Sequence, residues 1–260
     1  MFLPFLLGGT TGLLLGLTGA GGGVLASPLL ILVLHQSVTS SAPIALVSVC
    51  VGAGVGAWMG LRQGIVRYRA ALLMSLKGLA MSPLGIYVAR KVPNTPLILV
   101  FALLLLFQGW RYWQQGPVQQ DREFPCRLDE VSGRIQWDRA CFWTMLRMGG
   151  LTGFLSGLLG VGGGFVLVPA LRRHTPLTLH SVTATSLMVL TLVSLGGVLQ
   201  WLAIGQIQWR LATPFLAGVV TGIVFGRSQM HRLGETHMRR LFSLLCFGVA
   251  GSLLIKGLSQ

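Results

Sequence analysis

The chain has 260 residues, of which 53% are hydrophobic and 10% are charged, and its mean hydropathy is +0.73. A water-soluble domain of this length could not cover so much apolar surface, so the composition excludes the soluble classes and indicates an all-α, polytopic membrane protein. The net charge of +14 does not point to nucleic acid, because Lys and Arg lie in short connections between apolar runs, where positive charge orients membrane helices.

The first stretch, from Met1 to Leu34, contains no charged residue. As one continuous helix it would be roughly 50 Å long, whereas the hydrocarbon layer of a membrane is about 30 Å thick. Glycine, which costs about 1 kcal/mol relative to alanine inside a helix, fills four of the five positions from Gly19 to Gly23. We therefore predict two half-helices, about Leu3 to Leu17 and Val24 to Leu34.

A glycine-rich segment occurs twice. Gly12 to Leu30 reads GLLLGLTGAGGGVLASPLL, Gly153 to Leu171 reads GFLSGLLGVGGGFVLVPAL, and the same offset carries Ser40 to Ser181 without a gap. The chain is therefore a tandem duplication. Because the first copy recurs in the interior and lacks a basic start, we do not interpret it as a cleaved signal peptide. We expect a first membrane repeat at residues 1–113, an aqueous connecting loop at 114–140 and a second membrane repeat at 141–260.

Each repeat is completed by three apolar runs of about 20 residues, the length of a transmembrane helix. They are Ala42 to Leu61, Ala70 to Ala89, Thr95 to Trp113, His180 to Ile204, Gln208 to Gly226 and Leu241 to Leu258. The connecting loop holds five of the six carboxylates, Asp121, Glu123, Asp129, Glu130 and Asp138. None of the predicted spans contains a carboxylate, which argues against a proton relay through Asp or Glu and against a cation site.

Two topologies treat both glycine-rich elements alike, and in a third, mixed one only one of the two elements turns back. If each element crosses the membrane once, the repeats are parallel and the positive residues divide almost evenly between the two sides; the second copy, between Arg147 and Arg172, is short enough to be one tilted span. If each element turns back as a re-entrant hairpin, the repeats are inverted and the positive residues gather on one side. The residues on the less positive side are then Arg90, Lys91, Arg210 and Lys256. This asymmetry favours inverted repeats with both termini outside.

A helix that is broken at membrane depth exposes backbone N–H groups and the positive end of a helix dipole, which together form a ready anion site. The alternative is that the glycines only permit close helix packing. Because the block G-x-x-x-G-x-x-G-x-G-G-G is repeated, we favour the binding interpretation. The predicted binding glycines are Gly19, Gly21, Gly22, Gly23, Gly160, Gly162, Gly163 and Gly164.

Lys77 lies near the middle of the predicted span from Ala70 to Ala89. An ammonium at that depth costs on the order of 2.5 to 3.5 kcal/mol, so we expect Lys77 to face a cavity and to bind an anion. The alternative is a shifted span in which the Lys77 stem carries the charge to the surface.

Hydroxyl groups follow each glycine-rich element. The predicted substrate donors are Ser40, Ser41, Thr183, Thr185 and Ser186. For any one of them, a bond to a neighbouring helix carbonyl is an equally weighted alternative. His180, near a predicted helix end, is the histidine to test as a proton carrier.

The four cysteines, Cys50, Cys126, Cys141 and Cys246, are widely separated and form no CxxC pair, so we expect neither a metal site nor a disulfide framework. The sequence has no Walker-type phosphate loop, no GxSxG, no HExxH and no paired carboxylates. We therefore expect no enzyme and no cofactor. Transport without a nucleotide site must run on a gradient or by facilitated passage.

Both halves begin with a GxxGxGGG block followed by a proline, at Gly16 to Pro28 and at Gly157 to Pro169, and each ends its next span with a glycine, Gly64 or Gly205. In these features the chain resembles the TauE/SafE sulfite exporter family of bacterial inner-membrane permeases. The resemblance covers nearly all of both halves and leaves out the connecting loop. It implies outward movement of sulfite, sulfoacetate or related sulfonates across the inner membrane.

Members of that family often have an acidic residue shortly after the glycine that ends the second span. This chain has Arg67 and Gln208 in the corresponding neighbourhoods. A role for such a carboxylate is therefore not expected here.

Together these features predict a secondary transporter of small anions, with sulfite or an organosulfonate as the substrate, whose two repeats move against each other in alternating access. A channel-like anion facilitator and a membrane-anchoring subunit of a complex are the alternatives. The expected partners are a small anionic solute and the lipid bilayer, without nucleic acid, and homo-oligomerisation is left open.

Overall fold

The structure is a computed structural model, and it describes residues 2–18, 22–34, 36–114, 125–126, 136–205, 208–229 and 235–258. These residues form ten α-helices and one 3-10 helix, without a strand, which confirms the all-α prediction. In chain order they are α1 (Phe2–Thr18), the 3-10 helix η1 (Gly22–Leu25), α2 (Ala26–Val33), α3 (Val38–Arg62), α4 (Tyr68–Lys91), α5 (Asn94–Gln114), α6 (Arg139–Leu159), α7 (Gly164–His174), α8 (Leu179–Ile204), α9 (Trp209–Gln229) and α10 (Glu235–Leu258).

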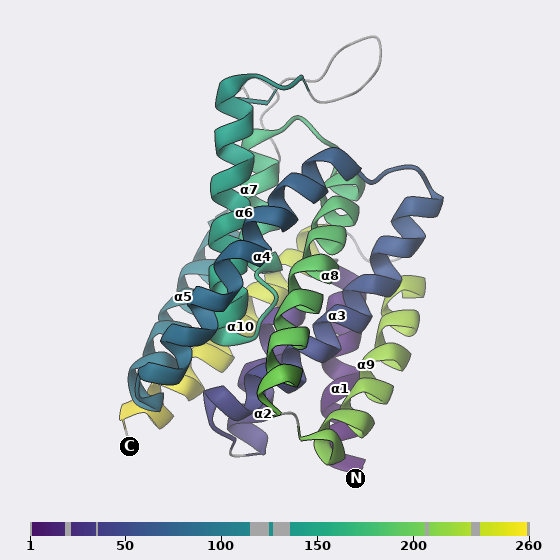
Figure 1. The fold of residues 1–260 in the computed structure, drawn as a ribbon. Coiled ribbons are helices and arrows are strands. Elements are labelled where there is room, and N and C mark those ends of the chain that lie inside the picture. Colours follow the sequence, from purple (N-terminus) through teal and green to yellow (C-terminus); the bar gives the residue numbers. More distant parts are fainter. Residues whose placement is uncertain are drawn as a thin grey trace.

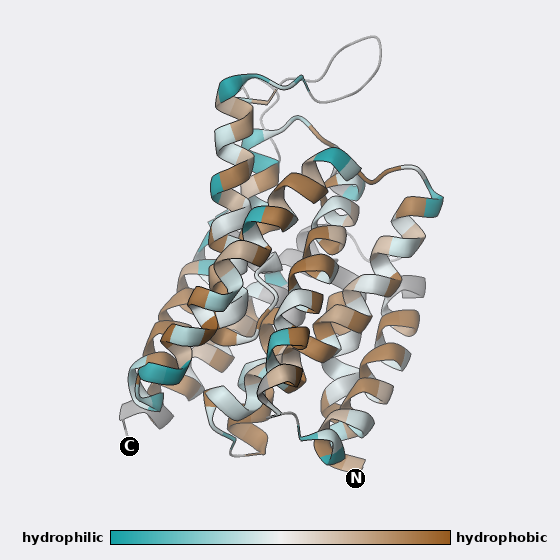
Figure 2. Ribbon diagram, in the orientation of Figure 1, coloured by the Kyte–Doolittle hydropathy of each residue, from teal (hydrophilic) through white to brown (hydrophobic). Residues whose placement is uncertain are grey.

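Five of the helices in the described part of the chain, α3, α4, α5, α8 and α9, are long and apolar enough to cross a membrane. Helices α1 and α10 contain shorter apolar stretches, at Phe2–Gly16 and Ser243–Ile255. Figure 2 shows apolar residues along the length of the bundle and the most hydrophilic residues near its two ends. The protein is therefore a multi-pass membrane protein.

Local sequence sets the helix ends in the same way in both halves. Ser37 precedes α3 and accepts a hydrogen bond from the Ser40 N–H, and Thr178 precedes α8 and accepts one from the Ser181 N–H. After α3 and α8 come Gly64 and Gly205, with φ values of +68° and +73°. A Cβ atom at either glycine would meet nothing within 4 Å, so these positions require glycine for its conformation and not for space.

Each glycine-rich element turns back on itself. In Figure 1, α1 starts at the end of the bundle that holds both termini and α2 returns to that end, whereas α6 starts at the opposite end and α7 returns there. The second turn is also fixed by bonds, because Cys126 is joined to Cys141 in the first turn of α6 and donates its N–H to the carbonyl of His174, the last residue of α7. One continuous tilted span at the second element is therefore excluded.

The two halves are packed into each other. The four most extensive helix interfaces join α1 to α9, α4 to α6, α3 to α8 and α5 to α10. The first two are equivalent under the repeat offset, so each hairpin packs on a helix of the other half. Glycines allow these helices to touch at the backbone: a Cβ atom on Gly12 would overlap Val219, and one on Gly153 would overlap Gly78.

Positive residues mark one end of the bundle. The end of α3, the starts of α4 and α6 and the end of α7 carry Arg62, Arg67, Arg69, Arg139, Arg172 and Arg173. We call this the arginine-rich end; it is the upper end in Figure 1. The opposite end has Arg90 and Lys91 in the last turn of α4 and Arg210 in the first turn of α9.

Candidate functional site

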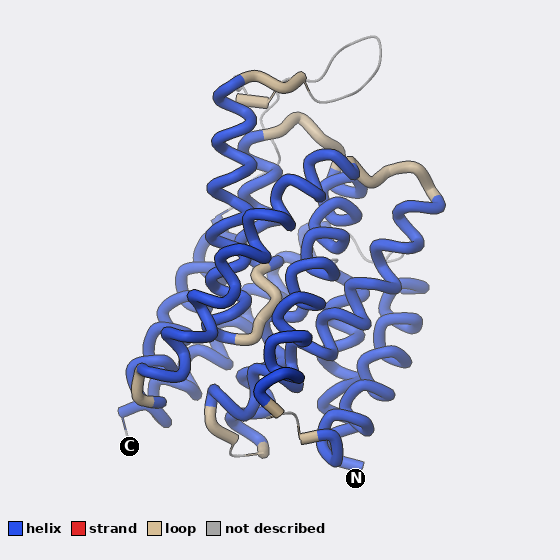
Figure 3. Tube along the Cα trace, viewed as in Figure 1, coloured by secondary structure: helices blue, strands red, loops and turns tan. Residues whose placement is uncertain are grey.

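The second glycine-rich element breaks the chain inside the bundle. Helix α6 ends at Leu159, and Gly160, Gly162 and Gly163 follow with φ values of +69°, +72° and +67°, a region that only glycine enters readily. Figure 3 shows this loop within the bundle, whereas the other described loops lie at its ends. Helix α7 begins at Gly164 after Gly163, which offers no side chain to cap it, so the first N–H groups of α7 lack side-chain partners at membrane depth.

The glycines of this break also have close neighbours. A Cβ atom on Gly160 would overlap Ala42 of α3, and one on Gly163 would lie 2.5 Å from the Thr152 carbonyl oxygen. These positions therefore need glycine both for its conformation and for its small size.

The first element meets the second at this point. Helix α1 ends at Thr18, Gly22 and Gly23 form the start of η1, and the predicted half-helices are confirmed; Gly19 and Gly21 lie outside the described residues. Ser27, in the first turn of α2, is fully buried and donates its hydroxyl to the carbonyl of Leu159 at 3.0 Å. The returning half-helix of one hairpin thus binds a carbonyl that the end of α6 leaves unpaired.

Buried polar side chains without hydrogen-bond partners surround the second break. They are Ser82 of α4, Thr152 and Ser156 of α6, and Ser194 and Trp201 of α8, each at most 1% exposed. We call these five residues the polar cluster. An unpaired buried polar group costs about 1 to 3 kcal/mol, so five such groups in one region indicate a place where a polar ligand or water binds.

Contacts between the glycines and these side chains connect the cluster to the break. A Cβ atom on Gly162 would lie 3.3 Å from Ser194 Oγ, and one on Gly197, a turn further along α8, would lie 3.7 Å from Ser82 Oγ. The backbone of Ser82 in turn lies against Gly157, which is next to Ser156. The cluster therefore runs from the loop of the break along the α4, α6 and α8 interfaces.

Trp201 extends the cluster toward the end that holds the termini. Its side chain is fully buried among apolar residues that include Ala42 and Leu46 of α3 and Ile86 of α4, yet its indole N–H has no partner. An indole N–H can only donate, and a serine or threonine hydroxyl can donate as well as accept. Together with the first amides of α7, the cluster is suited to a ligand that accepts hydrogen bonds, as an oxyanion does.

The hydroxyls predicted from the sequence are divided by the structure. Ser41 and Ser186 are buried and unpartnered, as a ligand-binding role requires, and Ser41 is next to Ala42, which lies against Gly160 of the break. Ser40 belongs to the cap of α3, where its hydroxyl lies 2.9 Å from Ser37 Oγ. Thr183 donates to the His180 carbonyl of its own helix, and the Thr185 hydroxyl accepts the N–H of Arg67. His180 itself is exposed at the start of α8.

Lys77 lies outside the polar cluster. Its half-buried stem packs over Gly150 of α6, with Cγ 3.4 Å from where a Cβ atom would stand. Residues advance by about 100° along a helix, which places Lys77 and Ser82 more than a quarter turn apart around α4. Binding of an anion by the Lys77 ammonium stays a prediction. The packing of Lys77 over Gly150 does not bring its stem to the polar cluster.

None of the five members of the polar cluster was predicted from the sequence. Each is a small polar residue or a tryptophan within an apolar span, and such residues are common in membrane helices. A signal was nevertheless present in the duplication for some of them: the repeat offset pairs Ser194 with Ala53 and Trp201 with Gly60, so these two polar groups are not part of the duplicated pattern, whereas Thr152 pairs with Thr11.

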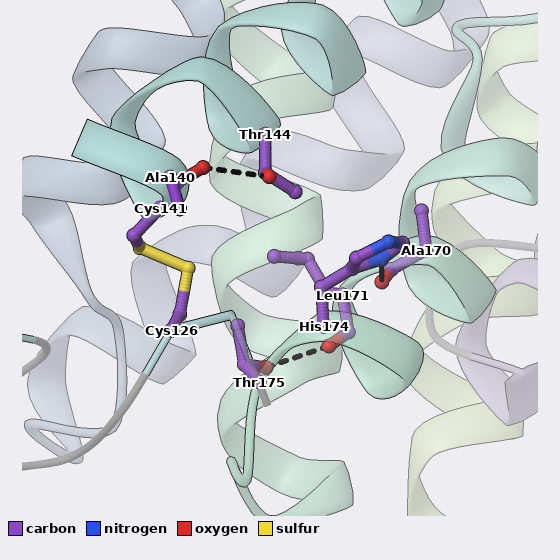
Figure 4. Close-up of a disulfide and its surroundings, with 8 residues drawn as sticks. All are labelled: Cys126, Ala140, Cys141, Thr144, Ala170, Leu171, His174 and Thr175. Carbon is purple, nitrogen blue, oxygen red and sulfur yellow. Dashed lines mark hydrogen bonds between the residues drawn. A yellow bond between two sulfur atoms is a disulfide. The ribbon is translucent and has the colours of Figure 1, made fainter. Parts of the chain in front are cut away.

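The prediction of ordinary cysteines was wrong for two of the four. Cys126 and Cys141 form a disulfide, drawn in Figure 4 beside His174 and Thr175 at the end of α7. Their separation of 15 residues matches no short motif, and Cys126 also donates its N–H to the carbonyl of His174 at the end of α7. Cys50 and Cys246 are free. Among the described residues, no group of three or more His, Cys, Asp or Glu side chains could hold a metal ion.

Comparison with known proteins gives a consistent result. The family model described as "Sulfite exporter TauE/SafE" matches residues 4–253. A "Probable membrane transporter protein" of Xylella fastidiosa (strain Temecula1) is 30% identical over 94% of this chain and 90% of its own length. A protein of the same description from Methanocaldococcus jannaschii is 23% identical over 98% of this chain and 96% of its own length. No solved structure matches the chain significantly.

Proposed function

Because the chain belongs to the TauE/SafE sulfite exporter family and is a membrane transporter, we propose that it is a secondary transporter of small anions, with sulfite or an organosulfonate as its substrate. The observation that carries this proposal is the polar cluster of unpartnered donors around the second break. We infer transport and not catalysis, since the sequence offers no catalytic constellation.

The chemistry of the cluster favours an anion. A sulfite or sulfonate group presents several oxygen acceptors and no strong donor, and the cluster presents hydroxyls and an indole N–H. The N-terminus of α7 adds the positive end of a helix dipole. No carboxylate lies in the five described spans, so no fixed negative charge there would repel an anion or compensate a cation.

The interlocked halves suggest how the solute crosses. We infer an inverted repeat, in which each hairpin packs on a helix of the other half. We call each of these two contacts a glycine seam, because Gly12 touches the backbone of Val219 in one and Gly153 touches that of Gly78 in the other. Sliding along these two seams would open the central region to one side and then to the other, which is alternating access. The break would stay near the midplane during this motion because Ser27 and Leu159 join the two hairpins there.

The arginine-rich end is assigned to the cytoplasm of a bacterial inner membrane, with both termini outside, because positive residues accumulate on the cytoplasmic side. The disulfide between Cys126 and Cys141 lies at this end. Cytoplasmic glutathione and thioredoxin keep most thiols reduced, so we infer that the pair is a dithiol in growing cells and a disulfide after oxidation.

The test is uptake of labelled sulfite into vesicles that contain the purified protein. Replacing Ser194 with alanine (Ser194→Ala) removes one donor, and a hydrogen bond to a charged group contributes about 1.5 to 3 kcal/mol, so KM should rise about 10- to 100-fold. The matched control is Ser75→Ala, because Ser75 is also buried but donates to the Ala71 carbonyl at 2.7 Å.

Equal changes in KM for the two substitutions would exclude a role of the polar cluster in substrate binding. Saturable flux with exchange of labelled solute across the membrane supports a carrier. Flux that rises linearly with concentration supports the channel-like facilitator instead.

A further inference from the structure

A second candidate site lies away from the break, at the arginine-rich end. A pocket of about 300 Å³ is formed where α3 turns into α4 and where the chain enters α6. The side chains that matter for its chemistry are Arg67, Arg69, Tyr68, Trp137 and Leu61. The pocket thus combines two guanidinium groups with two aromatic rings and a leucine.

The arginines of this pocket have unused hydrogen-bonding capacity. Arg67 Nε is buried and has no partner, and Arg69 is exposed, with its guanidinium 6.0 Å from the Tyr68 ring. None of the residues that line the pocket is a carboxylate, and neither arginine forms an ion pair with any carboxylate in the described ranges. A buried guanidinium N–H without a partner is costly, and its natural partner is an oxyanion.

The backbone holds this pocket in a fixed shape. Gly64 takes a left-handed conformation in the turn, with φ +68°, and the Arg67 N–H donates to Thr185 Oγ1 at 3.0 Å. Ser181 Oγ donates to the Ile65 carbonyl at 2.7 Å. Both serine and threonine belong to α8, so the turn of the first half is anchored to the second half and the arginines are positioned before any ligand arrives.

From these observations we propose that this pocket is a binding site for a tetrahedral oxyanion, a phosphate or sulfonate group, held by Arg67 and Arg69. Two arginines can bind such a group through paired N–H donors. The first turn of α4 also lines this pocket, and no side chain caps its N–H groups, because the N-cap residue Arg67 forms no side-chain hydrogen bond there. This site is distinct from the polar cluster, because the pocket shares no residue with it.

The surroundings favour the head group of an anionic phospholipid as the source of the oxyanion. Tyr68 and Leu61 are 53% and 44% exposed, and Trp137 is 39% exposed, so the rim would meet lipid at the membrane surface. Tyrosine and tryptophan are enriched at that depth, and basic pockets at the cytoplasmic side bind anionic head groups. A free anion that enters from the water could use the same arginines.

The experiment measures the melting temperature of the full-length protein in detergent with added phosphatidylglycerol, phosphatidylcholine or inorganic phosphate. The variants are Arg69→Gln and the double substitution Arg67→Gln/Arg69→Gln. The matched control is Arg62→Gln. Arg62 lies in the last turn of α3, does not line the pocket, and stacks its guanidinium 3.9 Å from the centre of the Trp58 ring. At a ligand concentration about 100-fold above Kd, the wild type should gain on the order of 5 °C or more.

The proposal predicts that phosphatidylglycerol stabilises the wild type and Arg62→Gln, and that the gain shrinks in Arg69→Gln and disappears in the double variant. Stabilisation by phosphate alone, lost in the same variants, supports the site with a free anion as its source. Equal loss in Arg62→Gln and the double variant would reveal general charge attraction and overturn the proposal. So would equal stabilisation by phosphatidylcholine, or no stabilisation by any of the three.

Discussion

The two glycine-rich elements share a backbone plan and differ in the side chains around them. Both turn back inside the bundle, and both pack on a helix of the other half through a glycine seam. Around the second element lie Ser82, Ser156, Ser194 and Trp201, each buried without a partner. The repeat offset pairs these four with Ile223, Leu15, Ala53 and Gly60, which carry no polar side chain.

This difference distinguishes the residues that build the fold from the residues that are candidates for substrate binding. Features that the duplication preserved, such as the glycine seams and the glycines that end α3 and α8, build the fold in both halves. The first element is surrounded by an apolar cluster that includes Leu15, Ala45 and Ile223. The polar groups that break the repeat pattern are therefore the better candidates for the function of this chain.

The largest effect is expected when the second break loses its glycine. Gly160→Ala places a Cβ atom in a left-handed conformation that costs about 1 to 2 kcal/mol, and the atom also overlaps the backbone of Ala42. With overpacking of about 1 to 3 kcal/mol, the free energy of unfolding should fall by about 2 to 5 kcal/mol. Chemical unfolding in detergent measures this change.

The matched control is Gly205→Ala, which has a similar φ but open space around the added atom. Its loss should be limited to about 1 to 2 kcal/mol. If both substitutions destabilise the protein equally, the break is not a tightly packed point.

The second prediction concerns the disulfide, which only the second hairpin carries among the described residues. Closing a loop of 15 residues contributes about 3 kcal/mol in the chain-entropy model. Reduction, or Cys126→Ser, should therefore lower the unfolding free energy by about this amount and increase proteolysis near the start of α6. A reductant that leaves the unfolding curve of the oxidised wild type unchanged would contradict this expectation.

Thiol labelling of the same two cysteines tests which side of the membrane the arginine-rich end faces. If the arginine-rich end faces the cytoplasm, Cys126 and Cys141 should be labelled without prior reduction when cells are denatured in the presence of a thiol reagent, which also exposes these two buried side chains. Protection of both cysteines until a reductant is added would place this end outside.

The third prediction removes the indole donor and keeps an aromatic ring. Trp201→Phe should weaken sulfite binding about 10-fold or more, because a donor to a charged ligand is lost. Calorimetric titration of the purified protein measures the change. Trp209→Phe is the control, since Trp209 is 50% exposed at the start of α9, and a similar loss there would exclude a specific role for the Trp201 indole.

The smallest effect is expected at Lys77. Because its stem packs over Gly150 on the flank of α4, Lys77→Met should change the KM for sulfite by less than about threefold. A change above 10-fold would return the ammonium to the substrate site, as the sequence first suggested.

The helix breaks and several helix ends could be predicted from the sequence, because they depend on residues close together in the chain. Glycines in an overlong apolar run force a break, and the positions of Gly64 and Gly205 mark where α3 and α8 end. Arginine placement favoured the topology in which the hairpins turn back. These inferences need only helix length, glycine conformation and charge.

The site was harder to predict because it depends on which helices meet. Whether a serine hydroxyl bonds to its own helix, as in Ser75, or stays unpaired, as in Ser82, is decided by packing between the halves. Lys77 packs on Gly150 of α6, and Cys126 reaches Cys141 across a separation of 15 residues. None of these contacts has a signature in local sequence.

The most direct test of the central claim is equilibrium binding of sulfite to the purified double variant Ser82→Ala/Ser194→Ala. The matched control is Ser48→Ala/Ser75→Ala, in which two buried hydroxyls that already donate to Ala45 and Ala71 carbonyls are removed. We predict that Kd rises on the order of 100-fold or more in the first variant and less than about threefold in the control. Equal values of Kd in the two variants would contradict the claim that the polar groups outside the duplicated pattern bind the substrate.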